Sequence, residues 1–197
     1  QNVQPLHVFE SRYREMVEDA LRSDQLIAIA TLLPGYETDY YSRPPVAPQI
    51  CIGRVASHER TSDGKYNLVL VGISRAEIDS EVTPVKSYRR ANAQVLEERS
   101  PDADDTSVVA LGRDLAKCLA ASMPAAEDLV DDFHDGKLSL GTLTDIIAFH
   151  FPFSIDFKLT LLSERDAAVR ARLLRQKLPR PSQAHPPDAN PPRVSDN

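Results

Sequence analysis

The spacing of apolar residues changes once along the chain, close to Glu98. Before that point, apolar residues stand mostly in short runs separated by turn signals, which is typical of strands. One early stretch, Phe9 to Leu21, instead repeats them at helical spacing, and beyond Ser100 helical spacing is the rule. The sequence therefore predicts an α+β fold, with a β-meander followed by a C-terminal helical bundle.

Five segments of the first half are expected to be strands. We place them at residues 26–33, 50–58, 66–72, 75–78 and 87–96. The first stops at Pro34-Gly35, and the turn signal Ser62-Asp63-Gly64-Lys65 marks a hairpin between the second and the third. Residues 36–49 carry three prolines and three tyrosines, so we expect a loop there.

The second half is expected to be helical at 108–123, 125–133 and 140–149, with two shorter helices after them. Ser154 is placed to cap the first short helix, and Asp166 or Ser163 to cap the second. In the last helix we expect Arg170, Arg172 and Arg175 on the polar face, opposite the leucines.

Three regions follow from this pattern. Residues 1–98 are expected to form a β-meander with one N-terminal helix, and residues 99–178 a helical lobe. Residues 179–197 contain proline, serine, asparagine and aspartate with almost nothing apolar to bury, so a disordered tail is expected.

Composition excludes several classes of protein. No apolar run approaches the roughly 20 residues that span a bilayer, so we expect no membrane contact. The two cysteines, Cys51 and Cys118, lack the close spacing of a zinc or redox motif, which indicates free thiols in a reducing cytoplasm. The formal net charge is −6, and Glu97 to Lys137 holds eleven acids and four bases, so nucleic acid is not an expected partner.

The sequence also lacks the motifs of catalysis. It has no GxxxxGK[ST] segment to hold phosphates, and the hydroxyls that stand near a lysine, Ser62 near Lys65 and Ser87 near Lys86, lie in hairpin or strand contexts. The five histidines are scattered singly, without a second ligand at metal-binding spacing. We therefore expect no enzyme activity, no metal and no cofactor.

Three stretches resemble the N-terminal domain family of Lon proteases. PLHVFESRY at Pro5 to Tyr13 is similar to the family's PLRIFEPRY, with Ser11 where a proline is usual. The strands from Ile52 to Ala76 follow the family's progression G-x-V-A, D-G and L-V-x-G-x-x-R. Phe153 to Leu178 is similar to the family's closing helices, and together the likeness covers roughly residues 3–178.

The resemblance implies a twisted, PUA-like β-barrel followed by a helical bundle. It also implies a non-catalytic module that recognises unfolded or damaged polypeptides, present here as a free-standing copy without the ATPase or the protease. The family's first strand would precede Gln1, so we expect it to be missing and a sheet edge to be exposed.

The candidate peptide-binding residues are Tyr36, Tyr40 and Tyr41, which stand in the loop before Arg43-Pro44-Pro45. Tyrosine offers a large contact area with little loss of conformational entropy, so such a loop beside a barrel can hold an extended apolar segment. In the alternative interpretation, the tyrosines fold back onto the barrel and serve its packing.

Two other functions remain as alternatives. A protease-associated regulatory or scaffold protein would bind a folded protein partner rather than unfolded chains. A PUA-like RNA-binding module would use the bases of the barrel, which exceed nearby acids by only two charges. Those bases are Arg54, Arg60, Lys65, Arg75, Lys86, Arg89 and Arg90, and the acids are Glu59, Asp63, Glu77, Asp79 and Glu81.

Overall fold

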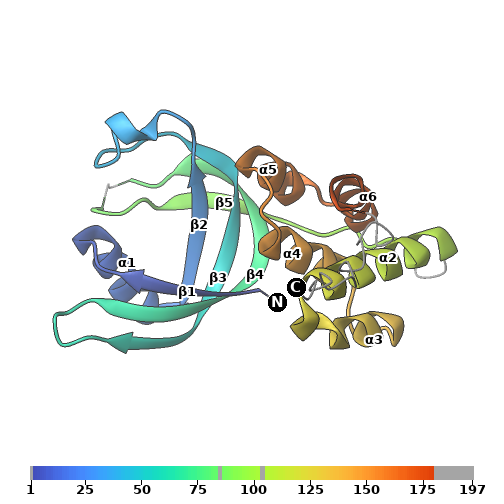
Figure 1. The fold of residues 1–197 in the computed structure, drawn as a ribbon. Helices are drawn as coiled ribbons and strands as arrows, with labels where there is room; N and C mark the ends of the chain where they lie inside the picture. The colour runs from blue at the N-terminus through green and yellow to red at the C-terminus, as the bar shows by residue number, and fades with distance from the viewer. Residues whose placement is uncertain (1, 84–85, 103–104, 180–197) are drawn as a thin grey trace, which may run out of the picture.

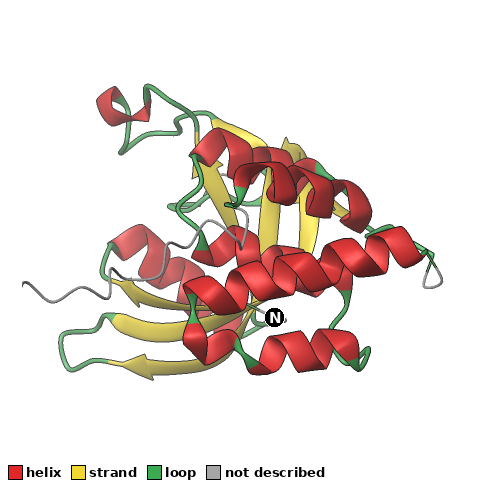
Figure 2. Cartoon of the chain, turned by 45° about the vertical axis from the view of Figure 1, so that its right-hand side comes forward, coloured by secondary structure: helices red, strands yellow, loops and turns green. Residues whose placement is uncertain are grey.

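A curled antiparallel sheet and a lobe of helices lie side by side in the computed structural model (Figure 1). The structure describes residues 2–83, 86–102 and 105–179. The predicted disordered tail therefore lies, apart from Pro179, outside the described residues. The helices after the sheet gather on one side of it (Figure 2), so the α+β fold predicted from the sequence is confirmed.

The sheet has the strand order β1-β4-β3-β2, with β5 also paired to β4. The strands are β1 (Val3–Val8), β2 (Leu26–Leu32), β3 (Val46–Arg60), β4 (Tyr66–Glu81) and β5 (Ala91–Leu96). The first half of β4 pairs with β1 and the second half with β5, and β3 pairs along both halves. The long strand β4 therefore holds the other strands of the sheet in register.

Four strands differ from the prediction. β3 begins at Val46, inside the expected loop 36–49, and ends at Arg60 rather than at residue 58. The expected strands 66–72 and 75–78 are one strand, because a bulge at Ile73 lets the pairing with β3 continue: Gly72 faces Gly53, and Ser74 faces Ile52. β5 begins at Ala91 rather than at residue 87. β1 was not expected, because Pro5 lies in its middle; proline is tolerated there because β4 is the only described strand that pairs with β1. The expected loss of a preceding family strand stays a prediction.

The helix α1 (Ser11–Leu21) packs its inner face into the sheet, at the end away from the helical lobe (Figure 1). Its buried residues Val17 and Ala20 join an apolar cluster formed by the strands. The other buried members of this cluster are Val8, Ile27, Val55, Tyr66, Leu68 and Leu70. The barrel thus has a core of its own.

The helical lobe contains α2 (Thr106–Ser122), α3 (Asp128–His134), α4 (Leu140–His150), α5 (Ile155–Ser163) and α6 (Ala167–Lys177). The described residues also form two 3-10 turns, η1 (Tyr36–Thr38) after β2 and η2 (Pro124–Ala126) between α2 and α3. Ser154 caps α5 by accepting from the Phe157 amide, and Asp166 is the residue that caps α6. A second apolar cluster, separate from that of the barrel, fills the lobe and includes Leu115, Leu143 and Leu174.

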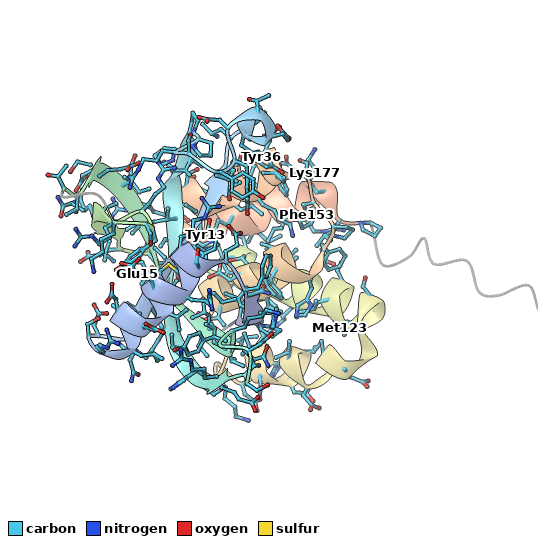
Figure 3. The ribbon with its side chains drawn as sticks, turned by 90° about the vertical axis from the view of Figure 1, so that its left-hand side faces the viewer. Tyr13, Glu15, Tyr36, Met123, Phe153 and Lys177 are labelled. Carbon is cyan, nitrogen blue, oxygen red and sulfur yellow. The ribbon has the colours of Figure 1, made fainter. Side chains whose placement is uncertain are left out.

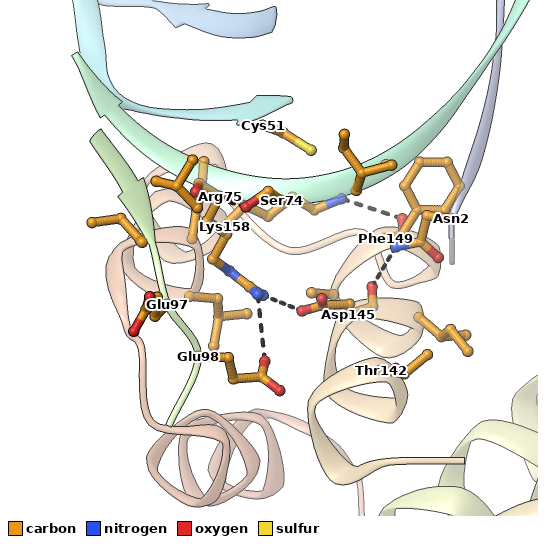
Figure 4. A pocket seen from close by; sticks show the side chains of 18 residues that line it. Asn2, Cys51, Ser74, Arg75, Glu97, Glu98, Thr142, Asp145, Phe149 and Lys158 are labelled. Carbon is orange, nitrogen blue, oxygen red and sulfur yellow. Dashed lines mark hydrogen bonds and ion pairs between the residues drawn. The ribbon is translucent and has the colours of Figure 1, made fainter. Parts of the chain in front are cut away.

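An ionic network joins the two lobes. Glu98, just after β5, accepts from Arg170 of α6 and lies 3.6 Å from Arg75 of β4, and Arg75 also pairs with Asp145 of α4. Figure 4 shows the carboxylates of Glu98 and Asp145 both directed at Arg75. The Arg170 side chain also donates to Thr144 Oγ1 at 3.1 Å.

The expectation that Arg170 lies on a polar face is wrong. Its side chain is only 1% exposed, because Glu98, which follows β5, and the α4 residues Thr144 and Asp145 surround its guanidinium. Helical spacing shows which residues share a face of a helix, but it does not show that a neighbouring lobe supplies a carboxylate. Arg170 is therefore a residue of the lobe junction.

Candidate functional site

Exposed apolar side chains gather at two cavities. The first, the barrel cavity, has a volume of about 750 Å³ and lies between β1, α1, β2, the loop at residues 40–46 and the segment 86–89. Phe9, Ile29 and Tyr41 line it, although they are 60%, 46% and 90% exposed. Large apolar side chains that stay in water around one hollow are typical of a binding site.

The structure brings two of the three predicted tyrosines to the barrel cavity. Tyr40 and Tyr41 line it, whereas Tyr36 does not. Tyr36 packs beside Tyr40 with 6.3 Å between ring centroids, in the loop that stands above Tyr13 of α1 (Figure 3). Tyr36 thus supports the loop.

Tyr40 is fixed in place by the junction of β1 and α1. Its hydroxyl donates to Glu10 Oε1 at 2.9 Å, and the Arg12 guanidinium lies 5.0 Å from the centre of its ring. The hydrogen bond to the Glu10 carboxylate raises the pKa of Tyr40, because that carboxylate stabilises the protonated phenol. Tyr40 therefore fits the alternative in which the loop folds back onto the barrel.

Tyr41, unlike Tyr40, has its side chain in solvent. Its ring meets the edge of Tyr40 at a centroid distance of 5.3 Å and an interplanar angle of 85°. With 90% of its surface exposed, it contributes almost nothing to the core. The fixed Tyr40 thus holds an exposed aromatic ring at the mouth of the barrel cavity.

Sequence reasoning missed Phe9 and Ile29. Phe9 was assigned to the buried face of a helix, but it precedes α1 and is exposed. Ile29 lies in the apolar run at 26–33 that is predicted as a strand, yet 46% of its surface is exposed. A run that is apolar on both faces also occurs where one face lines an open cavity, and the sequence does not distinguish the two cases.

Paired charges surround the mouth of the barrel cavity. Arg43 donates to Glu81 Oε2 at 2.5 Å, and Arg89 donates to the other oxygen of the same carboxylate. The hydrogen bond from Arg89, together with that from Arg43, holds the pKa of Glu81 below its usual value. On the α1 side, Lys86 Nζ lies 2.6 Å from Asp19 Oδ2.

The Glu81 pairs predict a pH dependence of stability. A carboxyl group whose pKa is lowered by folding stabilises the protein above its unfolded pKa, which is near 4.5, and loses this effect as the pH falls through the lower folded pKa. We expect wild-type protein to be more stable than Glu81→Gln at pH 6, and the difference to shrink below about pH 4.5. Urea unfolding of both proteins at pH 6 and pH 3.5 measures this, and a difference that grew on acidification would contradict it.

The second cavity, the inter-lobe cavity, has a volume of about 630 Å³ and lies between the sheet and helices α4 and α5 (Figure 4). The exposed apolar side chains Ile73, Val95 and Phe149 line it. Cys51 also lines it, and burial raises the pKa of its thiol, which disfavours the reactive thiolate. Its charged groups Arg75, Glu98 and Asp145 already serve the network that joins the lobes.

The lysines that stand near hydroxyls in the sequence are engaged in ion pairs. Lys65 lies 2.7 Å from Asp63, and Lys86 pairs with Asp19. The Ser87 hydroxyl donates to Glu15 rather than to Lys86. A lysine acting as a general base has to lose its proton, and a carboxylate partner opposes that loss.

Within residues 2–83, 86–102 and 105–179, no three His, Cys, Asp or Glu side chains stand close enough together to hold a metal ion. None of the helices in this part of the chain combines the length and the apolar character that crossing a membrane requires.

A family model described as the ATP-dependent protease La (LON) substrate-binding domain matches residues 1–179. The chain is 27% identical over 184 residues to a Lon protease of Anaeromyxobacter dehalogenans and 26% identical over 184 residues to Lon protease 2 of Myxococcus xanthus. These alignments cover 90% of this chain but 21% and 22% of the two relatives, so the chain spans about a fifth of their length.

Two solved structures share the fold. One is a Lon N-terminal domain protein from Xanthomonas campestris, with a TM-score of 0.64, 23% identity and 90% of each chain covered. The other is the N-terminal domain of the Mycobacterium avium complex Lon protease, with a TM-score of 0.65 and 20% identity over 89% of this chain and 88% of that one. At these identities the likeness supports the architecture alone.

Proposed function

This chain belongs to the LON substrate-binding domain family, and from that premise we propose that it binds unfolded polypeptide segments in the barrel cavity without chemistry of its own. The family description names substrate binding, and the substrates of a protease are polypeptides. A cavity of about 750 Å³ with an apolar lining has room for the side chains of a short extended segment.

The observation that carries this proposal is the exposure of Tyr41 beside a fixed Tyr40. An aromatic ring that is 90% exposed gains much apolar contact when a partner covers it. The Tyr40–Glu10 hydrogen bond and the stacking of Arg12 keep the neighbouring ring in position before binding, so little entropy is lost at that point. Phe9 and Ile29 extend the same apolar surface from β1 and β2.

The charges of the barrel disfavour the RNA alternative. Of the seven bases considered for RNA binding, five form ion pairs with carboxylates: Arg60, Lys65, Arg75, Lys86 and Arg89. Phosphate binding gains its free energy from cations that neutralise phosphates and release counterions. Bases that already pair with carboxylates contribute little to the free energy of phosphate binding.

Replacing Tyr41 with alanine tests the proposal. We expect Tyr41→Ala to weaken binding of a permanently unfolded, carboxymethylated protein roughly tenfold, as for an aromatic residue at the centre of an interface. Stability should change by less than about 0.5 kcal/mol, because the side chain is exposed. Fluorescence anisotropy of the labelled unfolded protein measures the affinity.

Ile155→Ala is the matched control. Ile155 on α5 is also an exposed large apolar residue, at 63%, but it lines neither cavity described above. We expect this variant to bind like the wild type. Equal affinity of wild type and Tyr41→Ala would exclude the barrel cavity as the binding site, and capture of folded proteins alone would favour the scaffold alternative.

A further inference from the structure

We propose that the barrel cavity selects apolar segments that carry an acidic side chain beside the apolar residues. This inference rests on the proposed function, since it names the kind of polypeptide that the same cavity prefers. The groups that confer the preference are Arg43 and Arg89, which line the cavity at its mouth.

One carboxylate serves two arginines at this place. Glu81 accepts from Arg43 at one oxygen and from Arg89 at the other. Each arginine also donates to one backbone carbonyl: Arg43 to Lys86 O at 3.3 Å, and Arg89 to Pro44 O at 2.5 Å. Carbonyls orient a guanidinium but carry no net charge, so the group of three side chains keeps one positive charge in excess.

Arg12 and Lys86, the other Lys and Arg side chains of the lining, each have a carboxylate partner. Arg12 Nη2 lies 2.9 Å from Glu10, and Lys86 pairs with Asp19, which also accepts from the Tyr88 hydroxyl at 2.8 Å. The excess charge is therefore localised at the Arg43–Glu81–Arg89 group. A segment bound on Tyr41 and Phe9 gains if its neighbouring residue places a carboxylate there.

The expected preference for acidic segments is small, because the Arg43–Glu81–Arg89 group is partly exposed. The side chains of Arg43, Arg89 and Glu81 are 35%, 32% and 37% exposed, so water and salt screen their field. Charges at the rim of an interface act mainly on the association rate and on specificity. We therefore expect a roughly threefold preference at low salt, within the range that exposed ion pairs give.

Three labelled peptides test the selection. They share one apolar centre and carry aspartate, asparagine or lysine on both flanks. Against the full chain at low salt, we expect the aspartate peptide to bind roughly threefold more tightly than the asparagine peptide, and the lysine peptide to bind most weakly. Adding about 0.5 M salt should remove the difference, since the Debye length then falls to a few ångströms.

Two variants change the net charge of the Arg43–Glu81–Arg89 group in opposite directions. Arg89→Gln leaves Arg43 and Glu81 as a neutral pair, so the three peptides should bind alike. Glu81→Gln leaves two arginines without their carboxylate, so the preference for aspartate should increase. Arg172→Gln makes the same change of charge on an exposed residue of the helical lobe and should leave the preference intact.

The outcomes separate this inference from the proposed function. Equal binding of all three peptides by the wild type overturns the charge selection and leaves peptide binding standing. A preference that persists in Arg89→Gln also overturns it. Absence of binding by every peptide overturns both proposals, and displacement of the aspartate peptide by a nine-nucleotide RNA would show that the excess charge serves nucleic acid instead.

Discussion

Replacing Glu98 with glutamine is expected to lower the free energy of unfolding by about 3 kcal/mol. Arg170 is 1% exposed, and Glu98 is the carboxylate that accepts from it. Removing the charge of Glu98 leaves a buried guanidinium whose other hydrogen-bond partners, Thr144 Oγ1 and backbone carbonyls, are neutral, and whose remaining carboxylate, that of Asp145, lies 3.9 Å from Nε. Breaking a buried pair costs about 3–5 kcal/mol, and we take the lower end because 32% of the Glu98 side chain is exposed.

Urea unfolding at pH 7 measures this loss. Asp135→Asn is the control, because Asp135 pairs with Lys137 where both side chains are at least half exposed, and a loss below about 1 kcal/mol is expected there. In the Glu98→Gln background, Arg170→Met should restore part of the stability, since it removes the buried charge that has lost its hydrogen-bonded carboxylate. If Glu98→Gln cost no more than Asp135→Asn, the junction would not depend on this ion pair.

Gly112→Ala is expected to destabilise the helical lobe by about 2 kcal/mol. Alanine in place of glycine inside a helix normally stabilises a protein by about 1 kcal/mol. Here a Cβ atom at Gly112 of α2 would overlap the ring of Phe133 from α3, so α2 and α3 would have to separate or the ring would have to move. Phe133 packs against the apolar cluster of the lobe, so it has little free space.

The double variant gives the sharper measurement. In a Phe133→Ala background the overlap is gone, and Gly112→Ala should then increase stability by up to about 1 kcal/mol. The sign of the Gly112→Ala effect is thus expected to depend on Phe133. A destabilisation of the same size in both backgrounds would show that the glycine is needed for a reason other than the approach of this ring.

The order of elements was predictable from the sequence because periodicity reflects which faces are buried. The amphipathic spacing of residues 9–21 predicted α1, and the apolar run at 26–33 predicted β2. The ends of both elements lie within two residues of the predicted ends. The continuity of β4 was not predictable, because a bulge at Ile73 depends on its pairing with β3 and not on its own residue type. Likewise, the burial of Arg170 depends on Glu98, which lies 72 positions away along the chain.

The candidate site was predictable only in part. Tyrosines in a proline-rich loop indicated a contact surface, and Tyr40 and Tyr41 do line the barrel cavity. The different roles of these two residues depend on Glu10 and Arg12, which belong to another part of the chain. Phe9 and Ile29 line the cavity because of the path that β1 and β2 take around it. No local pattern of residues specifies that path.

The pairing of β1 with β4 also determines when the barrel can close during synthesis. His7 and Asn67, which are hydrogen-bonded across the two strands at 2.7 Å, are 60 residues apart in sequence. At about 5–20 residues per second, Val3–Val8 wait several seconds on the ribosome before their partner strand emerges. During that interval the nascent chain carries a strand without its β4 partner next to the apolar Phe9, and such an exposed edge favours association with other chains.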